Sequence, residues 1–281
     1  MTKHFRKVTT LVVGGTGKTG AEVAKGLKAL GQAVAVTSRH ADPAFDWNDP
    51  SNWPEVVGSA EQLYISYAPD LALPAAAEQI TELARIAVAQ GTRRIVLLSG
   101  RGEPECEPAE QAVRKAGAAW TILRCSWFNQ NFSEGALAPA VLSGVLRMPA
   151  GEVREPFIDT RDIAACAVVA LSQPGHEGAI YELTGPRLLG FADAAREISQ
   201  ASGQPLGYQS VSVAEYARDL SAHFPPDLAE WLAALFGRVL DGRNAHTTPD
   251  VARLLGRQGR DFSDFVRAAA ASGAWGARAA E

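Results

Sequence analysis

Hydrophobic positions along this chain form short β-branched runs separated by longer stretches of helical period. The first run, Val8 to Val13, has the length of a strand, and a helical face with four apolar positions follows it: Val23, Ala24, Leu27 and Leu30. Further strand-like runs cover residues 33–39, 61–67, 93–100 and 120–124, and helical stretches at 74–90 and 108–116 separate the last three. This alternation predicts an α/β fold, a Rossmann-type doubly wound parallel sheet whose ligands bind beyond the carboxyl ends of the strands.

The last third of the chain is dominated by helical periods at residues 212–224, 227–242 and 248–256, and an alanine-rich helix continues from Ala268. We therefore expect a Rossmann domain over residues 1–155. Residues 156–281 are expected to hold the remaining sheet elements and a smaller, mostly helical lobe that binds the substrate. One apolar stripe there either packs against the Rossmann domain or forms a cleft wall or a dimer contact: Trp231, Leu232, Leu235 and Phe236.

The glycine-rich segment "VVGGTGKTG" at residues 12–20 is similar to two phosphate-binding motifs. A nucleoside-triphosphate loop, Gly-x-x-x-x-Gly-Lys-Ser/Thr, needs a glycine where this chain has Val12. The dinucleotide pattern Gly-x-Gly-x-x-Gly is met by Gly15, Gly17 and Gly20, and a variant that begins at Gly14 also fits. Because a strand precedes the segment and a helix follows it, we predict a dinucleotide site with the phosphates at the helix N-terminus.

The residues at the end of the second predicted strand, residues 33–39, favour NADP(H) over NAD(H) as the cofactor. An NAD site usually has an acidic residue there for the ribose 2′-hydroxyl, whereas a 2′-phosphate requires a nearby arginine. This chain reads Thr37-Ser38-Arg39 and has no carboxylate before Asp42. We predict that Arg39 pairs with the 2′-phosphate through its planar guanidinium; the alternative is a solvated loop residue.

Composition narrows the class of protein further. The 281 residues carry a formal net charge of −4. The chain therefore lacks the excess of positive charge that is typical of proteins that bind nucleic acid or an anionic membrane. No apolar run reaches the roughly 20 residues that span a bilayer, so we expect a cytoplasmic protein. The three cysteines, Cys106, Cys125 and Cys166, are scattered and form no metal motif, and we expect each to be buried.

Eight segments resemble, in order and spacing, the NmrA-like atypical short-chain dehydrogenases, in particular the branch with the agroclavine and festuclavine dehydrogenases and their bacterial relatives. They are "GGTGKTG", "TSR", "FDWNDPSNW", "YAPDLALP", "RRIVLLSG", "AWTILRCSWFNQNFSE", "PFIDTRDIA" and "YELTGP". The resemblance runs from about Val8 to Arg267. It implies an extended Rossmann sheet, a smaller helical lobe and a ligand cleft between the two.

The resemblance also implies site residues. Asp46 and Trp47 would border the adenine. Residues of the glycine turn and of two later strand ends would line the rest of the cofactor: Gly14, Gly15, Thr16, Gly17, Lys18, Thr19, Gly20, Tyr67, Ala68, Pro69, Ser99 and Gly100. Residues around the nicotinamide and the substrate would be Ser126, Trp127, Phe128 and Asn131.

The usual catalytic pair of short-chain dehydrogenases, Tyr-x-x-x-Lys, is missing because no tyrosine lies between Ser99 and Gly178. The catalytic lysine of the related phenylpropanoid reductases also has no counterpart in residues 102–117. Without these residues, we expect catalysis by positioning, in which the protein holds NADPH beside an electrophilic carbon in a dry cleft. Such catalysis suits activated substrates such as iminium ions, quinones or enones.

Two side chains are candidate proton donors, each with a structural alternative. Tyr67 either faces the nicotinamide or packs beside the cofactor, and Glu110 either transfers protons or anchors its helix. His176 and His246 are expected at the solvated surface, with no metal site, and Asp159 or Asp162 is expected to cap the helix that follows.

Two functions follow: an NADPH-dependent reductase of a small molecule, or a non-enzymatic NADP(H) sensor that binds a protein partner. Either could act as a homodimer.

Overall fold

The computed structural model describes residues 10–135 and 137–276. Packing divides the chain into two units. The first contains the chain up to Cys125, with Thr160–Leu183 and Asp250–Arg257. The second contains Ser126–Asp159, Thr184–Pro249 and the chain from Gln258 onward. The predicted strand residues Val8 and Thr9 lie outside the described residues.

The first unit is built on a six-stranded sheet in the order β2-β1-β3-β4-β5-β8, and every pairing in it is parallel. The strands are β1 (Thr10–Val13), β2 (Val34–Thr37), β3 (Gln62–Ile65), β4 (Arg94–Gly100), β5 (Ala119–Cys125) and β8 (Ala179–Leu183). The chain leaves β1 toward β2 on one side and later returns to β3 on the other. This reversal places a topological switch point at the carboxyl end of β1, where open parallel sheets bind ligands.

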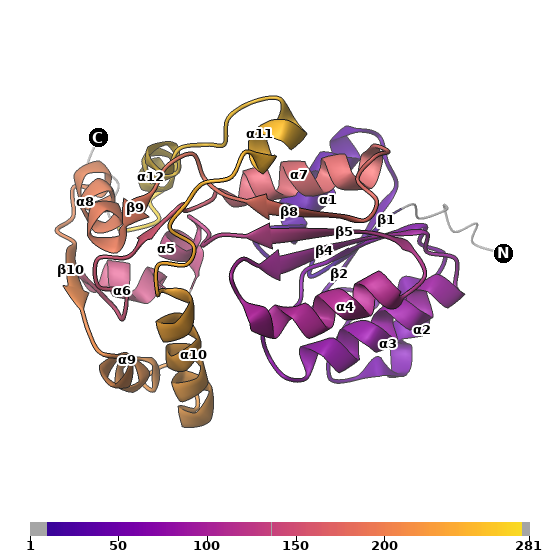
Figure 1. Ribbon diagram of the computed structural model, residues 1–281, viewed down its shortest axis with the longest axis horizontal. Helices are drawn as coiled ribbons and strands as arrows, with labels where there is room; N and C mark the ends of the chain where they lie inside the picture. Colours follow the sequence, from indigo (N-terminus) through magenta and orange to yellow (C-terminus); the bar gives the residue numbers. More distant parts are fainter. Residues whose placement is uncertain (1–9, 136, 277–281) are drawn as a thin grey trace. The chain divides into compact units, whose positions relative to one another are not determined.

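Helices cover both faces of this sheet, as Figure 1 shows. α1 (Gly20–Ala29) and α7 (Thr160–Ser172) pack together on one face, and α11 (Asp250–Leu255) packs on α7. The other face carries α2 (Trp53–Val57), α3 (Ala76–Ala89) and α4 (Glu107–Lys115), with short 3₁₀ turns η1 (Pro50–Asn52) and η2 (Pro104–Cys106) before α2 and α4. The predicted Rossmann-type α/β fold is therefore confirmed.

Two local details differ from the sequence pattern. Leu30, expected on the buried face of the first helix, follows the end of α1 and is 60% exposed, whereas Val23, Ala24 and Leu27 are buried. The sixth strand, β8, has mostly half-buried positions and therefore lacks the continuous apolar run of the inner strands.

The second unit is mostly helical with two small sheets. Strand β6 (Val145–Met148) pairs in parallel with β10 (Gly207–Ser210), and β7 (Arg154–Glu155) pairs antiparallel with β9 (Leu189–Gly190). Its helices are α5 (Asn131–Glu134), α6 (Ala138–Leu142), α8 (Phe191–Ser202), α9 (Val213–Leu220), α10 (Pro226–Val239) and α12 (Phe262–Ala271). Four buried phenylalanine rings form its core: Phe132, Phe157, Phe191 and Phe262. In the part of the chain that the structure describes, no helix combines the length and apolar character needed to cross a membrane.

Candidate functional site

The glycine turn after β1 joins three strand ends by backbone contacts. The N–H groups of Gly14 and Gly15 both donate to the Thr37 carbonyl at the end of β2, each at 3.1 Å. Gly14 has a φ of +76°, which favours glycine, and a Cβ there would lie 2.5 Å from the carbonyl oxygen of Ser66, just after β3. A Cβ at Gly20 would lie 2.3 Å from the Gly14 carbonyl oxygen. The turn is therefore packed backbone on backbone.

Gly17 differs from these glycines because it is exposed and almost uncrowded. A Cβ at Gly17 would meet one neighbour, the Gly14 carbonyl oxygen at 3.2 Å. Helix α1 begins three residues later, and Thr19 makes no side-chain hydrogen bond that caps it. An open glycine backbone next to an uncapped helix N-terminus fits a pyrophosphate, which needs close backbone approach and N–H donors.

The turn after β2 carries an exposed arginine. The Ser38 carbonyl accepts hydrogen bonds from the N–H groups of Ala41, at 3.2 Å, and Phe45, at 2.9 Å, which closes the turn. Arg39 lies at its tip, and among the described residues no ion pair involves its guanidinium. The guanidinium is thus available to an anionic ligand at the end of β2.

An aromatic cluster of Phe45, Trp47, Trp53 and Tyr67 lies beside this turn. Trp47 and Tyr67 have ring centroids 4.6 Å apart, and Asp46 is exposed between the two buried rings of Phe45 and Trp47. The Tyr67 hydroxyl donates to Gln79 Oε1 at 2.5 Å, and burial raises the pKa of Tyr67. These contacts are those of a packed aromatic side chain. Ala68 and Pro69 follow it and are exposed.

Glu110 lies in α4 with its carboxylate held from three sides. The Ser99 hydroxyl at the end of β4 donates to Oε1 at 2.7 Å, and Arg124 of β5 binds both oxygens at 2.8 and 2.6 Å. Arg114 adds a longer contact at 3.4 Å, and Glu110 is 1% exposed. A carboxylate in such contacts anchors α4 to the sheet, and this geometry favours the anchoring alternative over proton transfer.

One acid near the predicted cofactor residues was not singled out from sequence. Glu103, between β4 and η2, has its carboxyl group directly over the predicted cofactor residue Gly100. Burial and the nearby carboxylates of Asp70 and Glu105 raise the pKa of Glu103 to about 8. The signal in the sequence was weak, because the segment "GRGEPECEPAE" contains four acids and nothing in the pattern distinguishes Glu103 from the others.

The residues expected around the nicotinamide belong to the second unit. Ser126 is buried directly after β5, and the half-buried ring of Trp127 packs edge-on against Phe191 and Phe236, at 5.7 and 4.8 Å. Phe128 forms a β-bridge with Ile158, and Asn131 opens α5. Within the apolar stripe of α10, Leu235 is buried, and three residues are half-buried: Trp231, Leu232 and Phe236.

The cysteines, the histidines and Asp162 either pack or pair with other side chains or are exposed to solvent. The three cysteines are free and buried, as predicted, and burial raises the pKa of Cys166 to about 12. His176, expected at the solvated surface, is half-buried, and its Nδ1 lies 2.9 Å from the Tyr181 hydroxyl. His246 is exposed. Asp162, in the first turn of α7, is 1% exposed and pairs with Arg257 at 2.7 Å. Among the described residues, no group of three His, Cys, Asp or Glu side chains could hold a metal ion.

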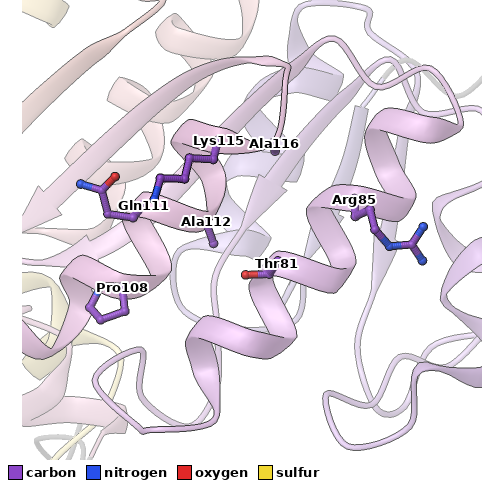
Figure 2. Close-up of a pocket in the computed structure, with 7 residues that line it drawn as sticks. All are labelled: Thr81, Arg85, Pro108, Gln111, Ala112, Lys115 and Ala116. Carbon is purple, nitrogen blue, oxygen red and sulfur yellow. The ribbon is translucent and has the colours of Figure 1, made fainter.

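A cavity of about 390 Å³ lies between α3 and α4. Figure 2 shows Thr81 and Ala112 on the two facing helices, with the Arg85 side chain pointing away from α4. No residue predicted to bind the cofactor or the substrate lines this cavity. It therefore adds nothing to the site at the strand ends.

Comparisons with known proteins now bear on this geometry. No protein-family model matches the chain. It is 31% identical to an NAD(P)H azoreductase of Xenophilus azovorans, an alignment that covers 93% of this chain and 98% of the relative. It is 29% identical to the agroclavine dehydrogenase of Claviceps fusiformis over 92% of this chain and 96% of that protein.

Among solved structures, the fold is similar to that of an NADPH-dependent quinone oxidoreductase of Escherichia coli complexed with NADPH. The TM-score is 0.78 at 25% identity, over 92% of this chain and 98% of that one. The chain belongs to the NmrA-like atypical short-chain dehydrogenase/reductase family. The resemblance drawn from the sequence motifs is thereby confirmed, and with it the class of NAD(P)H-dependent oxidoreductases.

Proposed function

We propose that this reductase uses NADPH to transfer hydride to a small, activated organic molecule such as a quinone, an enone or an iminium ion. The observation that carries the proposal is the glycine turn at the switch point, where the open backbone of Gly17 and the uncapped start of α1 lie together. Relatives named as an azoreductase and a quinone oxidoreductase support electrophilic, conjugated substrates.

The residues that would hold the cofactor lie along one edge of the first unit. Backbone N–H groups between Gly14 and Gly20 would bind the pyrophosphate, and Arg39 would bind the 2′-phosphate. Trp47 would border the adenine, with Asp46 beside it. The bound dinucleotide supplies the hydride, and the protein contributes placement and exclusion of water.

The preference for NADPH rests on the turn after β2. An exposed, unpaired guanidinium there can bind a 2′-phosphate with two parallel hydrogen bonds. The first carboxylate beyond it, Asp42, is exposed and lies three residues further along the chain. An acid at the strand end, which would bind a free 2′-hydroxyl and repel a phosphate, is missing.

The test is NADPH oxidation by the purified protein against a panel of quinones, cyclic iminium ions, enones and azo dyes, followed by absorbance. Binding of NADPH and NADP⁺ is measured in parallel by titration calorimetry. We expect turnover with at least one class and weaker activity with NADH. Tight binding without turnover of any class would contradict the proposal and favour a redox sensor that binds a protein partner.

A further inference from the structure

Glu103 has an unusual position for an acidic side chain in a loop. Its carboxyl group is folded back over the last residue of β4 instead of extending into solvent. A Cβ at Gly100 would lie 2.4 Å from both the carboxyl carbon and Oε1 of Glu103, so position 100 requires a glycine for this fold-back. The side chain is half-buried and keeps some access to water.

The surroundings of this carboxyl group favour its protonated form. Among the described residues, no ion pair involves Glu103, and its side chain does not cap η2. The Cys106 thiol donates to Oε2 at 3.7 Å, and burial together with Glu103 raises the pKa of that thiol, so it remains a donor. Two charged groups that act on Glu103 are Asp70, after β3, and Glu105 in η2, and both repel a second negative charge.

The position of the glycine turn indicates which part of the cofactor lies near Glu103. The pyrophosphate is expected at the turn after β1, and the 2′-phosphate end at β2, on one side of that turn. The other half of an extended dinucleotide must therefore run the opposite way, over the carboxyl ends of β3 and β4. Glu103 lies at the end of β4, on the side where the reactive ring is expected.

We propose that Glu103 is the proton donor of this reduction and contacts the substrate atom that gains the proton. The inference rests on the proposed function, since it assumes a substrate that requires a proton. The bound dinucleotide would supply the hydride, with its electron pair, to the substrate carbon or oxygen. The Glu103 O–H bond breaks, a new O–H or N–H bond forms on the substrate, and water returns a proton to the carboxylate.

Substrates of the proposed classes differ in whether they need this proton. A quinone that accepts hydride becomes an anion and must be protonated to give the hydroquinone. An N-alkylated cyclic iminium ion becomes a neutral tertiary amine by hydride addition alone. Glu103 is therefore required for the first class and dispensable for the second, a difference that a structural role of the same side chain would not produce.

The experiment compares Glu103→Gln with the wild-type protein in single-turnover reduction of a benzoquinone and of an N-methylated cyclic iminium ion. Removing a general acid slows proton-dependent reduction by about 100-fold or more. We expect such a loss with the quinone, a change below about threefold with the iminium ion, and unchanged NADPH affinity. The wild-type quinone rate falls above about pH 8, where the acid ionises, and this limb is absent in the variant.

Glu105→Gln is the matched control, because it removes the neighbouring acid of the same loop. It keeps the quinone rate within about threefold and moves the alkaline limb to lower pH, since one repulsive charge is gone. Equal losses with both substrates in Glu103→Gln would overturn the proposal in favour of a structural role. An unimpaired quinone rate would overturn it as well.

A readout independent of activity completes the test. The infrared difference spectrum of the protein between about pH 6 and pH 10 should contain the carbonyl band of a protonated carboxylic acid that titrates near pH 8 and is missing in Glu103→Gln. A missing band in the wild type would overturn the assignment. If the wild type reduced none of the substrates, the proposed function would fail and the donor role with it; turnover by an unimpaired variant would remove the donor role alone.

Discussion

The turn after β1 and the loop after β4 both close the carboxyl end of a parallel strand, but they are packed in opposite ways. In the turn, glycine backbone packs on backbone, and a Cβ at Gly14 or Gly20 would clash with a carbonyl oxygen at 2.5 or 2.3 Å. In the loop, a glycine backbone is covered by the carboxyl group of Glu103. The close contacts of Gly14 and Gly20 are therefore made with backbone carbonyl oxygens, whereas the loop concentrates acids with different partners.

Because of this difference, we expect the turn to bind phosphate and the loop to donate or accept protons. Backbone N–H groups keep their hydrogen-bonding ability across the physiological pH range, so the turn should bind phosphate with little dependence on the protein's ionisation. Two acidic residues that follow β4 illustrate the difference: Glu103, in the loop, and Glu110, in α4. Arg124 binds both carboxyl oxygens of Glu110, whereas burial and nearby carboxylates raise the pKa of Glu103 to about 8. A pKa of about 8 lets the Glu103 carboxyl group change its protonation near neutral pH.

The largest expected effect comes from breaking the scaffold of the loop. Glu110→Ala removes the buried partner of Arg124, which keeps its ion pair with Glu107 at 2.8 Å, and should lower the free energy of unfolding by about 3 kcal/mol. Urea denaturation measures this loss. NADPH affinity of the fraction that remains folded should stay within a few-fold of wild type, because the turn after β1 is untouched. A loss below about 1 kcal/mol would show that Glu110 does not anchor α4.

A substitution in the turn after β1 should have the opposite effect: it should lower NADPH affinity and leave stability nearly unchanged. Gly17→Ala places a methyl group on the open backbone where the pyrophosphate is expected, and it should weaken NADPH binding on the order of 100-fold while thermal stability stays near wild type. Gly20→Ala is the comparison: its Cβ meets the Gly14 carbonyl, so both stability and binding should fall. Equal affinities of Gly17→Ala and wild type in calorimetric titration would contradict the pyrophosphate site.

The pH dependence of stability measures the effect of Glu103 separately from that of the turn after β1. In the unfolded chain its carboxyl ionises near its ordinary pKa of 4.5, but in the folded protein it keeps its proton up to about pH 8. The folded state binds more protons between these values, so stability falls as pH rises through this window, by several kcal/mol. Denaturation of wild type and Glu103→Gln at several pH values measures it. The variant should show a shallower decline over the same window.

The smallest effect concerns the choice between the two nicotinamide cofactors. Arg39→Ala removes one charge-assisted contact to the 2′-phosphate and should raise the Kd for NADPH about tenfold, with the Kd for NADH unchanged. Arg93→Ala is a matched control, because Arg93 is also exposed but precedes β4 at the amino edge of the sheet. Parallel losses for NADPH and NADH would argue against the 2′-phosphate contact.

The alternation of strands and helices, the glycine turn and the arginine after β2 were all predictable from sequence. Each depends on residues within about ten positions of one another, where steric limits and periodicity act locally. The lack of a tyrosine between Ser99 and Gly178 is also a property of the sequence alone.

Tertiary structure decided what the acids of the loop do. Glu110 becomes an anchor because β5 brings Arg124 beside it, and the pKa of Glu103 is raised because the fold buries its carboxyl group and brings Asp70 near it. Similarly, β8 joins the sheet through its pairing with β5, without a strong apolar run of its own. Ionisation and pairing depend on neighbours that the fold brings together from distant positions, and a linear pattern of polar residues does not contain those distances.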